Sequence, residues 1–211
     1  MLFKWILFIL SFVPLLMCQQ PDCANLTPTT LNDTHIDQLS GKWYYVASAF
    51  GFLPYKEEAQ TVQSSFYYLI PNKTNDIVQG KEYNTIGDKC VYQESEVLLN
   101  RTNGTLIKTE QNQKHVAHIA LTQDPNAFLF FHFPNDKVLR GVVLSVRTQK
   151  ATEEQLKEFR EVTKCLGFKE EEIQYTDWTK DKCEPLEKEH NQKESKETKE
   201  TKEESSTQAL S

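Results

Sequence analysis

The sequence predicts an all-β protein: an eight-stranded antiparallel up-and-down β-barrel followed by one C-terminal α-helix. Eight segments rich in β-forming residues follow one another with short connections. The connections carry turn residues, such as Pro71–Asp76 and Asn103-Gly104. Apolar residues take up a helical period only after residue 151. Eight up-and-down strands close into a barrel wide enough to hold one small ligand.

Residues 1–18 have the features of a cleaved secretory signal. Lys4 precedes the apolar run Trp5–Phe12, and a small residue ends the segment. The run is too short to span a membrane, and no later segment is apolar for long enough. We therefore predict a protein secreted into the extracellular space, whose ligand-binding domain spans residues 19–188.

The charge and the cysteines narrow the class of protein further. The formal net charge of −6 argues against nucleic acid or an anionic membrane as a partner. We also expect the protein to be a monomer. An even number of cysteines beyond the signal indicates two disulfides, for which three pairings are possible. The sequence has no Cys-x-x-Cys spacing, so a cysteine zinc site or a thioredoxin-like redox pair has no support. We expect neither a metal nor a cofactor. The four cysteines are Cys23, Cys90, Cys165 and Cys183.

Five Asn-x-Ser/Thr sequons predict heavy N-glycosylation of the exported chain. Each occupied asparagine must lie at the surface. The two last sequons are so close together that a sugar on one disfavours a sugar on the other. The sequons begin at Asn25, Asn32, Asn72, Asn100 and Asn103.

A polar arm and one helical turn at Asp33–Leu39 precede the first strand, Gly41–Phe50. Strict alternation along this strand places Trp43, Tyr45, Ala47 and Ala49 on one face and the residues between them on the other. Trp43 has two interpretations: an ordinary core residue, which these ten residues alone favour, or a plug at the barrel end. We predict that Gly51–Glu58 forms a loop carrying Tyr55.

The remaining strands follow as a meander until a helix begins. Thr152 caps that helix, apolar residues recur at Leu156, Phe159 and Val162, and Gly167 ends it. A short strand is expected at Ile173–Tyr175. The remaining predicted strands are Thr61–Ile70, Ile77–Thr85, Cys90–Leu99, Thr105–Glu110, Lys114–Thr122, Ala127–Phe133 and Gly141–Thr148.

The composition changes abruptly after the last cysteine. Residues 189–211 consist almost entirely of Glu, Lys, Ser, Thr and Gln, and a Lys-Glu-x pattern repeats between Lys193 and Glu203. Such a segment has too little apolar surface to offset the entropy of an ordered chain. We therefore predict a charged, disordered tail, in which a transient helix is possible.

With Gly-x-Trp at 41–43, eight strands and then one helix, the chain resembles the lipocalins. Further stretches are similar to the heavily glycosylated plasma members of that family. The resemblance implies a plasma carrier of the acute phase that binds lipophilic and often basic drugs or steroids in the barrel. These stretches are Cys23–Leu26, Gly41–Phe50, Pro71–Thr74, Glu154–Phe159 and Tyr175–Lys188.

The resemblance also implies the disulfides Cys23–Cys165 and Cys90–Cys183. Glu82 is expected to meet a protonated ligand amine with Asn84 beside it, while Lys108 offers a handle for an anion. The alternative for Glu82 and Lys108 is a solvated strand face, or an ion pair with each other. His132 is interpreted as a hydrogen-bonded pocket or core histidine. The other positions expected to face the ligand are Tyr45, Tyr55, Val62, Tyr67, Leu69, Leu106, Ala117 and Phe130.

Catalysis finds little support in the sequence. His115 and His118 are three apart on a strand, so they point to opposite faces and cannot easily share a metal. Lipocalins with isomerase activity use a free thiol, whereas every mature cysteine here is expected to be paired. We predict a non-enzymatic carrier of small lipophilic ligands. The alternative is an immunomodulatory glycoprotein that acts through its N-glycans on cell-surface lectins.

Overall fold

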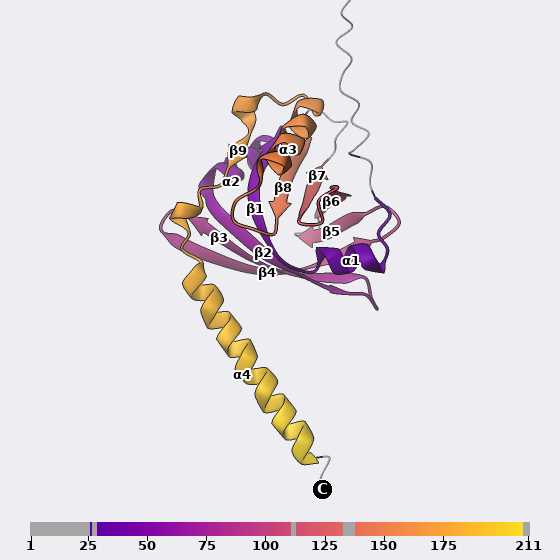
Figure 1. Ribbon diagram of the computed structural model, residues 1–211, viewed down its shortest axis with the longest axis vertical. Coiled ribbons are helices and arrows are strands. Elements are labelled where there is room, and N and C mark those ends of the chain that lie inside the picture. Colours follow the sequence, from indigo (N-terminus) through magenta and orange to yellow (C-terminus); the bar gives the residue numbers. More distant parts are fainter. Residues whose placement is uncertain (1–25, 27–28, 111–112, 133–137, 209–211) are drawn as a thin grey trace, which may run out of the picture.

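The structure is a computed structural model that describes residue 26 and residues 29–110, 113–132 and 138–208. It forms one barrel, with helices on its outside and a long C-terminal helix that points away from it (Figure 1). The predicted signal at residues 1–18 lies outside the described residues. The same is true of Cys23 and Asn25, so the predictions that involve them stay predictions.

Nine strands form one antiparallel sheet in the order β2-β3-β4-β5-β6-β7-β8-β1-β9, and β1 also pairs with β2. This last pairing closes the predicted eight-stranded barrel, and the short β9 is added outside the ring. The fold class is therefore confirmed. The strands are β1 (Gly41–Phe50), β2 (Val62–Asn72), β3 (Ile77–Ile86), β4 (Lys89–Asn100), β5 (Thr105–Glu110), β6 (Gln113–Leu121), β7 (Ala127–His132), β8 (Gly141–Val146) and β9 (Gln174–Tyr175).

The alternation predicted for β1 is wrong beyond Tyr45. The pairing of β1 with β8 shifts register between Tyr45 and Ala47, as a β-bulge does. One extra residue exchanges the faces of everything after it. Ala47 and Ala49 therefore pack outward against helix α3, whereas Ser48 and Phe50 turn toward the barrel interior with Tyr45.

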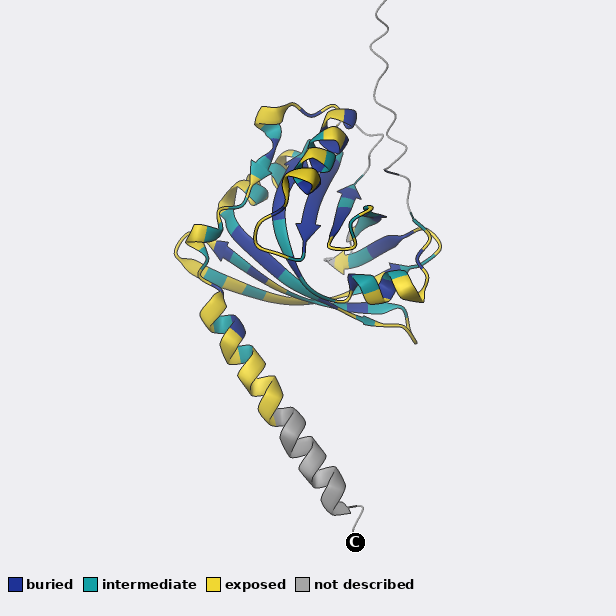
Figure 2. Cartoon of the chain, viewed as in Figure 1, coloured by how far each residue is buried: buried dark blue, intermediate teal, exposed yellow. Residues whose placement is uncertain are grey.

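Helix α3 (Glu153–Cys165) lies against the outside of the barrel and buries the apolar face that its sequence pattern predicts. Thr152 caps it: its hydroxyl accepts from the Gln155 amide, and the Gln155 side chain accepts from the Thr152 amide. Phe159 and Val162 are buried against outward residues of β1 and β8. The buried residues of Figure 2 accordingly line the contact between α3 and these strands.

One end of the barrel is closed by helix α1 (Asp33–Leu39), which Asn32 caps. Trp43 is fully buried there, donates its indole N–H to the Leu39 carbonyl at 2.7 Å, and packs edge-on against Phe128. The Arg147 guanidinium lies 3.6 Å from the centre of the Trp43 ring and donates to three backbone carbonyls beside it. Trp43 thus plugs the closed end.

Helix α2 (Leu53–Thr61) replaces the loop predicted at Gly51–Glu58. Pro54 occupies the first turn, where its fixed φ favours a helix, and the following Lys56–Gln60 are mostly good helix formers. The helix buries no residue. It lies at the open end of the barrel, above the junction of β1 and β2 (Figure 1).

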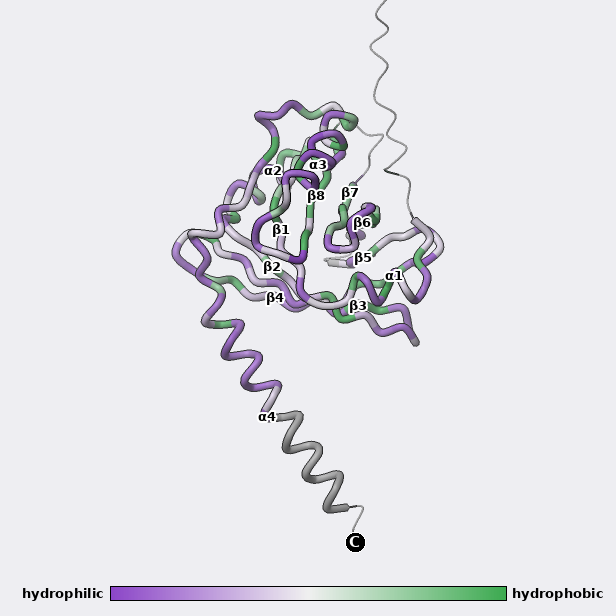
Figure 3. The backbone as a smooth tube through the Cα atoms, viewed as in Figure 1, coloured by the Kyte–Doolittle hydropathy of each residue, from purple (hydrophilic) through white to green (hydrophobic). Residues whose placement is uncertain are grey.

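Helix α4 (Glu184–Gln208) occupies the segment for which composition predicted disorder. The helical form has a local cause, because Glu and Lys are good helix formers and pair four residues apart, as in Glu184–Lys188 and Glu189–Lys193. The residues of α4 that carry a hydropathy colour in Figure 3 are mostly hydrophilic. Within the described part of the chain, no helix combines the length and the apolar character that crossing a membrane requires.

Candidate functional site

The barrel interior holds two adjoining chambers at its open end. The first, the α2 chamber, has a volume of about 230 Å³ and combines three aromatic rings with two carboxylates. Aromatic faces and carboxylates together favour an organic cation. The α2 chamber is lined by Tyr45, Phe50, Tyr55, Glu58, Ala59, Val62, Ser65, Glu82, Asn84 and His132.

The second, the β5–β6 chamber, has a volume of about 300 Å³ and is more apolar. Glu82 and His132 line both chambers, so the two spaces adjoin across these side chains. Lys108 and His115 add polar groups at its wall. Such an apolar space with few polar groups is typical of small-molecule sites. The β5–β6 chamber is lined by Glu82, Val97, Leu106, Lys108, His115, Ala117, Phe130, His132 and Val143.

A polar contact joins α2 to the opposite wall of the barrel. The Tyr55 hydroxyl lies 2.9 Å from Nδ1 of His115, which is on β6. The Tyr55 ring also packs edge-on against Phe50 and Phe52 and lies 5.9 Å from the His132 ring. This aromatic group holds α2 over the cavity, because the helix has no buried residue of its own.

Buried hydroxyl pairs lie next to the chambers. The Tyr45 hydroxyl donates to Ser48 Oγ at 2.5 Å, and the Tyr67 hydroxyl donates to Ser145 Oγ at 2.5 Å. Burial raises the pKa of Tyr45 to about 12, and burial likewise raises the pKa of Tyr67. Both tyrosines therefore stay neutral at physiological pH, and each donates its single O–H to a serine.

Glu82 and His132 are held in different ways. The Asn84 side-chain amide donates to Glu82 Oε1 at 2.9 Å, as the predicted position of Asn84 on the same strand face allows. His132 Nδ1 lies 2.9 Å from the Val116 carbonyl, which fixes it as the protonated ring nitrogen. Burial lowers the pKa of His132, so the ring is neutral at physiological pH.

Below the chambers, toward the closed end, the barrel is almost filled. A void of about 10 Å³ remains between α1 and residues such as Leu69, Leu99 and Ile119. Leu106 lines both this void and the β5–β6 chamber. Among the described residues, the two chambers therefore lie in the open half of the barrel.

Ten of the twelve predicted ligand-facing residues line the chambers. Tyr67 and Leu69 are the exceptions, because they lie deeper, among the residues packed around Trp43. Their contact with a ligand stays a prediction, as it does for the other ten. Those ten are Tyr45, Tyr55, Val62, Glu82, Asn84, Leu106, Lys108, Ala117, Phe130 and His132.

Several lining residues were missed in the sequence. Phe50 was missed because of the bulge in β1, and Glu58 and Ala59 because α2 was taken for a loop. Two more could have been found by alternation, because Ser65 and His115 are each two residues from a predicted position on the same strand. His118 lies on the outer face against Phe131, opposite to His115, as predicted. The other missed residues are Val97 and Val143.

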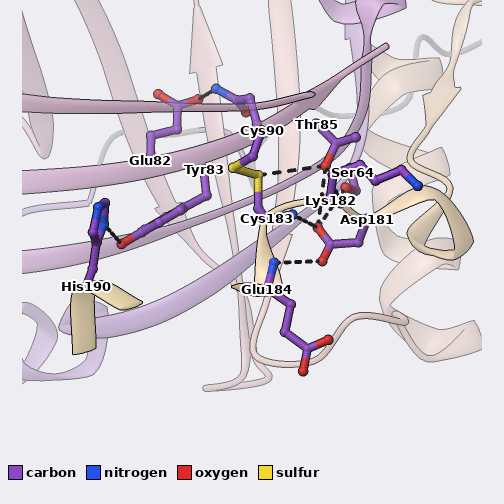
Figure 4. Close-up of a disulfide and its surroundings, with 11 residues drawn as sticks. Ser64, Glu82, Tyr83, Thr85, Cys90, Asp181, Lys182, Cys183, Glu184 and His190 are labelled. Atoms are coloured by element: carbon purple, nitrogen blue, oxygen red, sulfur yellow. Dashed lines mark hydrogen bonds between the residues drawn. A yellow bond between two sulfur atoms is a disulfide. The ribbon is translucent and has the colours of Figure 1, made fainter. Parts of the chain in front are cut away.

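The disulfide Cys90–Cys183 is confirmed, and it fastens β4 to the segment before α4. Figure 4 shows Asp181 beside it, which accepts from Ser64, from Thr85 and from the amides of Cys183 and Glu184. Cys165 is disulfide-bonded too, but its expected partner Cys23 lies outside the described residues. No group of three or more potential metal ligands occurs among the described residues.

The four described sequons lie at the closed end, away from the chambers. Asn32 caps α1, Asn72 ends β2, Asn100 ends β4, and Asn103 lies in the turn between β4 and β5. The turn residue Arg101 binds these segments together: it contacts Asp33 and Asp76 at 2.5 Å and donates to the Lys73 carbonyl. Asn32, Asn72 and Asn103 are exposed, and Asn100 is half-buried.

Comparison with known proteins agrees with this architecture. The family model described as "Lipocalin / cytosolic fatty-acid binding protein family" matches residues 40–180. The alpha-1-acid glycoprotein of Oryctolagus cuniculus is 41% identical over 91% of this chain and 96% of its own, and that of Bos taurus is 42% identical over 89% and 94%.

A solved structure supports the fold at lower sequence identity. The siderocalin Ex-FABP superposes with a TM-score of 0.54 at 14% identity, over 66% of this chain and 93% of its own. At this identity the likeness concerns the fold alone. The closed barrel, the family model and relatives matched over nearly their whole length lead to one conclusion: the chain belongs to the lipocalin family and is a homologue of the alpha-1-acid glycoproteins.

Proposed function

We propose that this protein is a secreted plasma glycoprotein that carries small lipophilic, often basic, ligands such as drugs and steroids inside its barrel. The observation that supports it is the pair of adjoining chambers at the open end, about 230 and 300 Å³ in volume. Together they offer an apolar body for the ligand and a polar end to orient it. The names of the relatives support the glycoprotein part of the proposal.

The chemistry of the α2 chamber favours a protonated amine as the polar end of the ligand. Glu58 and Glu82 supply negative charge, and the rings of Tyr45, Phe50 and Tyr55 supply electron-rich faces. Lys108 stands in the other chamber, where it suits an anionic group. The protein acts without catalysis in this proposal, since Cys90, Cys165 and Cys183 are all disulfide-bonded.

A fluorescent apolar probe titrated into the purified protein tests the carrier function. We expect saturable binding, and displacement of the probe by a basic lipophilic drug. Ala117→Phe fills the β5–β6 chamber and should weaken binding strongly, whereas Val116→Phe, one residue away on the outer face, should not. An absence of saturable binding to the wild-type protein would overturn the proposal.

A second function is supported by the position of the sequons. Sugars at the closed end would leave the mouth free, so binding of cell-surface lectins and carriage of ligand are compatible. We propose this immunomodulatory role in the acute phase as the alternative function. Enzymatic removal of the glycans should abolish lectin binding and leave probe binding intact, and a lectin-independent cellular activity would contradict it.

A further inference from the structure

The outer face of β2, β3 and β4 is divided into two parts along the strands. Toward the open end, the first turns of α4 cover an aromatic surface: the Tyr83 hydroxyl lies 2.9 Å from His190 Nδ1, and the His190 ring packs on Tyr92. Lys81, two residues before Tyr83 on the same face of β3, pairs with Glu194 of α4. Beyond this point α4 leaves the barrel wall (Figure 1).

The second part, toward the closed end, carries an aliphatic row. The strand register places Asn72 opposite Ile77, Ile77 opposite Leu98, and Leu98 opposite Ile107. Side chains at directly opposed positions share one face of the sheet, so these four form a continuous row across β2 to β5. We call Ile77, Leu98 and Ile107 the aliphatic row. Leu98 is 51% exposed, and Ile70, two residues before Asn72 on the same face, is 43% exposed.

The asparagine at the end of this row begins a sequon, Asn72-Lys73-Thr74. Asn72 is exposed, and its side-chain oxygen accepts from the Thr74 amide at 3.0 Å. This Asx turn fixes the side chain through its oxygen. The side-chain nitrogen, which is the atom that N-glycosylation modifies, is not used in this contact.

We infer that an N-linked glycan on Asn72 lies across the aliphatic row and shields it from water. Adjacent strands are about 4.8 Å apart, so Leu98 on β4 is two strand spacings, or about 10 Å, from Asn72. A chain of two sugar rings covers that distance. Each N-acetylglucosamine ring has one face of C–H groups, which can pack on Ile77 and Leu98 while the hydroxyl groups stay in water. The glycan thereby covers the exposed Leu98 and the half-buried Ile77 beside it.

The same geometry explains which sequon has this role. Asn32 lies in front of α1, and its sugar would start from the helix end rather than from the sheet. Asn103 lies in the turn beyond β4. Asn100 shares the face of Leu98 on β4, but it is half-buried and opposes Thr105 rather than a member of the row. Among the described sequons, Asn72 alone is directly opposed to a member of the aliphatic row. Exposed apolar surface of this kind promotes association when it is left uncovered.

Thr74→Ala removes this sequon and keeps Asn72, while Thr34→Ala removes the Asn32 sequon at the same end of the barrel. Hydroxyl-radical footprinting of the secreted proteins measures the exposure of Leu98 and Ile77. We expect Thr74→Ala to raise labelling of both residues at least threefold, and Thr34→Ala to leave it unchanged. Glycosidase treatment of the folded wild-type protein gives the same comparison without a substitution.

Sedimentation velocity adds a second readout. The protein without the Asn72 glycan should self-associate as its concentration rises, and Leu98→Ser should suppress that association. Mass spectrometry that finds Asn72 unmodified, or equal labelling of Leu98 with and without its glycan, overturns the inference. The inference rests on the glycosylation part of the proposed function, and either result leaves probe binding in the barrel unaffected, so the two failures are distinguishable.

Discussion

The Tyr55 hydroxyl and His115 Nδ1 lie 2.9 Å apart and join helix α2 to strand β6 across the mouth of the barrel. A hydrogen bond of this kind contributes about 1 kcal/mol. Tyr55→Phe keeps the ring contacts and should therefore raise the opening equilibrium of α2 about fivefold. Hydrogen exchange of the α2 amides and the association rate of an apolar probe measure this. Tyr175→Phe, on β9, is the control, and unchanged α2 exchange would show that the contact does not hold the helix.

Glu82 should select for cationic ligands. We expect Glu82→Gln to weaken binding of a protonated amine about fivefold, or about 1 kcal/mol, because the carboxylate is exposed at the mouth and water screens its charge. A neutral ligand of the same shape should bind as before. Calorimetric titration with both ligands checks this, with Glu96→Gln on the outer face of β4 as the control. Equal losses for both ligands would argue for a structural effect instead.

His132 should make the folded state sensitive to acid. Burial lowers its pKa below the ordinary value of 6.5, so the unfolded chain binds more protons, and stability falls as the pH drops below about 6.5. One such group changes the free energy of unfolding by at most about 1.4 kcal/mol per pH unit. His132→Phe should flatten the dependence of this free energy on pH, as measured by denaturant titrations between pH 7.5 and about pH 5.

His118 provides a comparison for this experiment, because burial lowers its pKa as well, on the outer face of β6. His118→Phe should flatten part of the profile, and the double variant should flatten most of it. A profile that is unchanged in the His132→Phe variant would show that the acid sensitivity has another source.

The first turns of α4 should belong to the folded domain. Glu187 is 9% exposed and pairs with Lys42, and Tyr68 donates to it at 2.5 Å. A chain ending at Cys183 leaves these groups and the aromatic surface of Tyr83 uncovered, which should cost about 2–4 kcal/mol of unfolding free energy. A chain ending at Lys196 should be as stable as the full chain. Thermal and urea unfolding test this, and equal stability of both truncated chains would contradict it.

The eight strands and α3 could be predicted because their signals are local. Turn dipeptides such as Asn103-Gly104 mark the hairpins: Gly104 has a φ of +56°, and a Cβ there would lie 2.2 Å from the Thr29 carbonyl oxygen. The capping box at Thr152 and the apolar spacing of Phe159 and Val162 likewise fix the start and the buried face of α3.

The features that the sequence did not reveal depend on contacts between distant residues. The bulge after Tyr45 appears only in the pairing of β1 with β8, and it decides that Phe50 faces the ligand chambers. Helix α2 depends on the contact of Tyr55 with His115, sixty residues away in the chain. The first turns of α4 are held against the barrel by Tyr83 and by the pair between Lys42 and Glu187. Composition alone contains none of these contacts.

The ion pairs of Arg101 join α1, the β2–β3 turn and the β4–β5 turn at the closed end of the barrel. The sequons of these segments therefore lie opposite the mouth. A receptor that binds the sugars at this closed end would contact the side of the barrel opposite the mouth. The mouth would then face away from the receptor. A receptor-bound molecule could therefore still bind and release its small ligand.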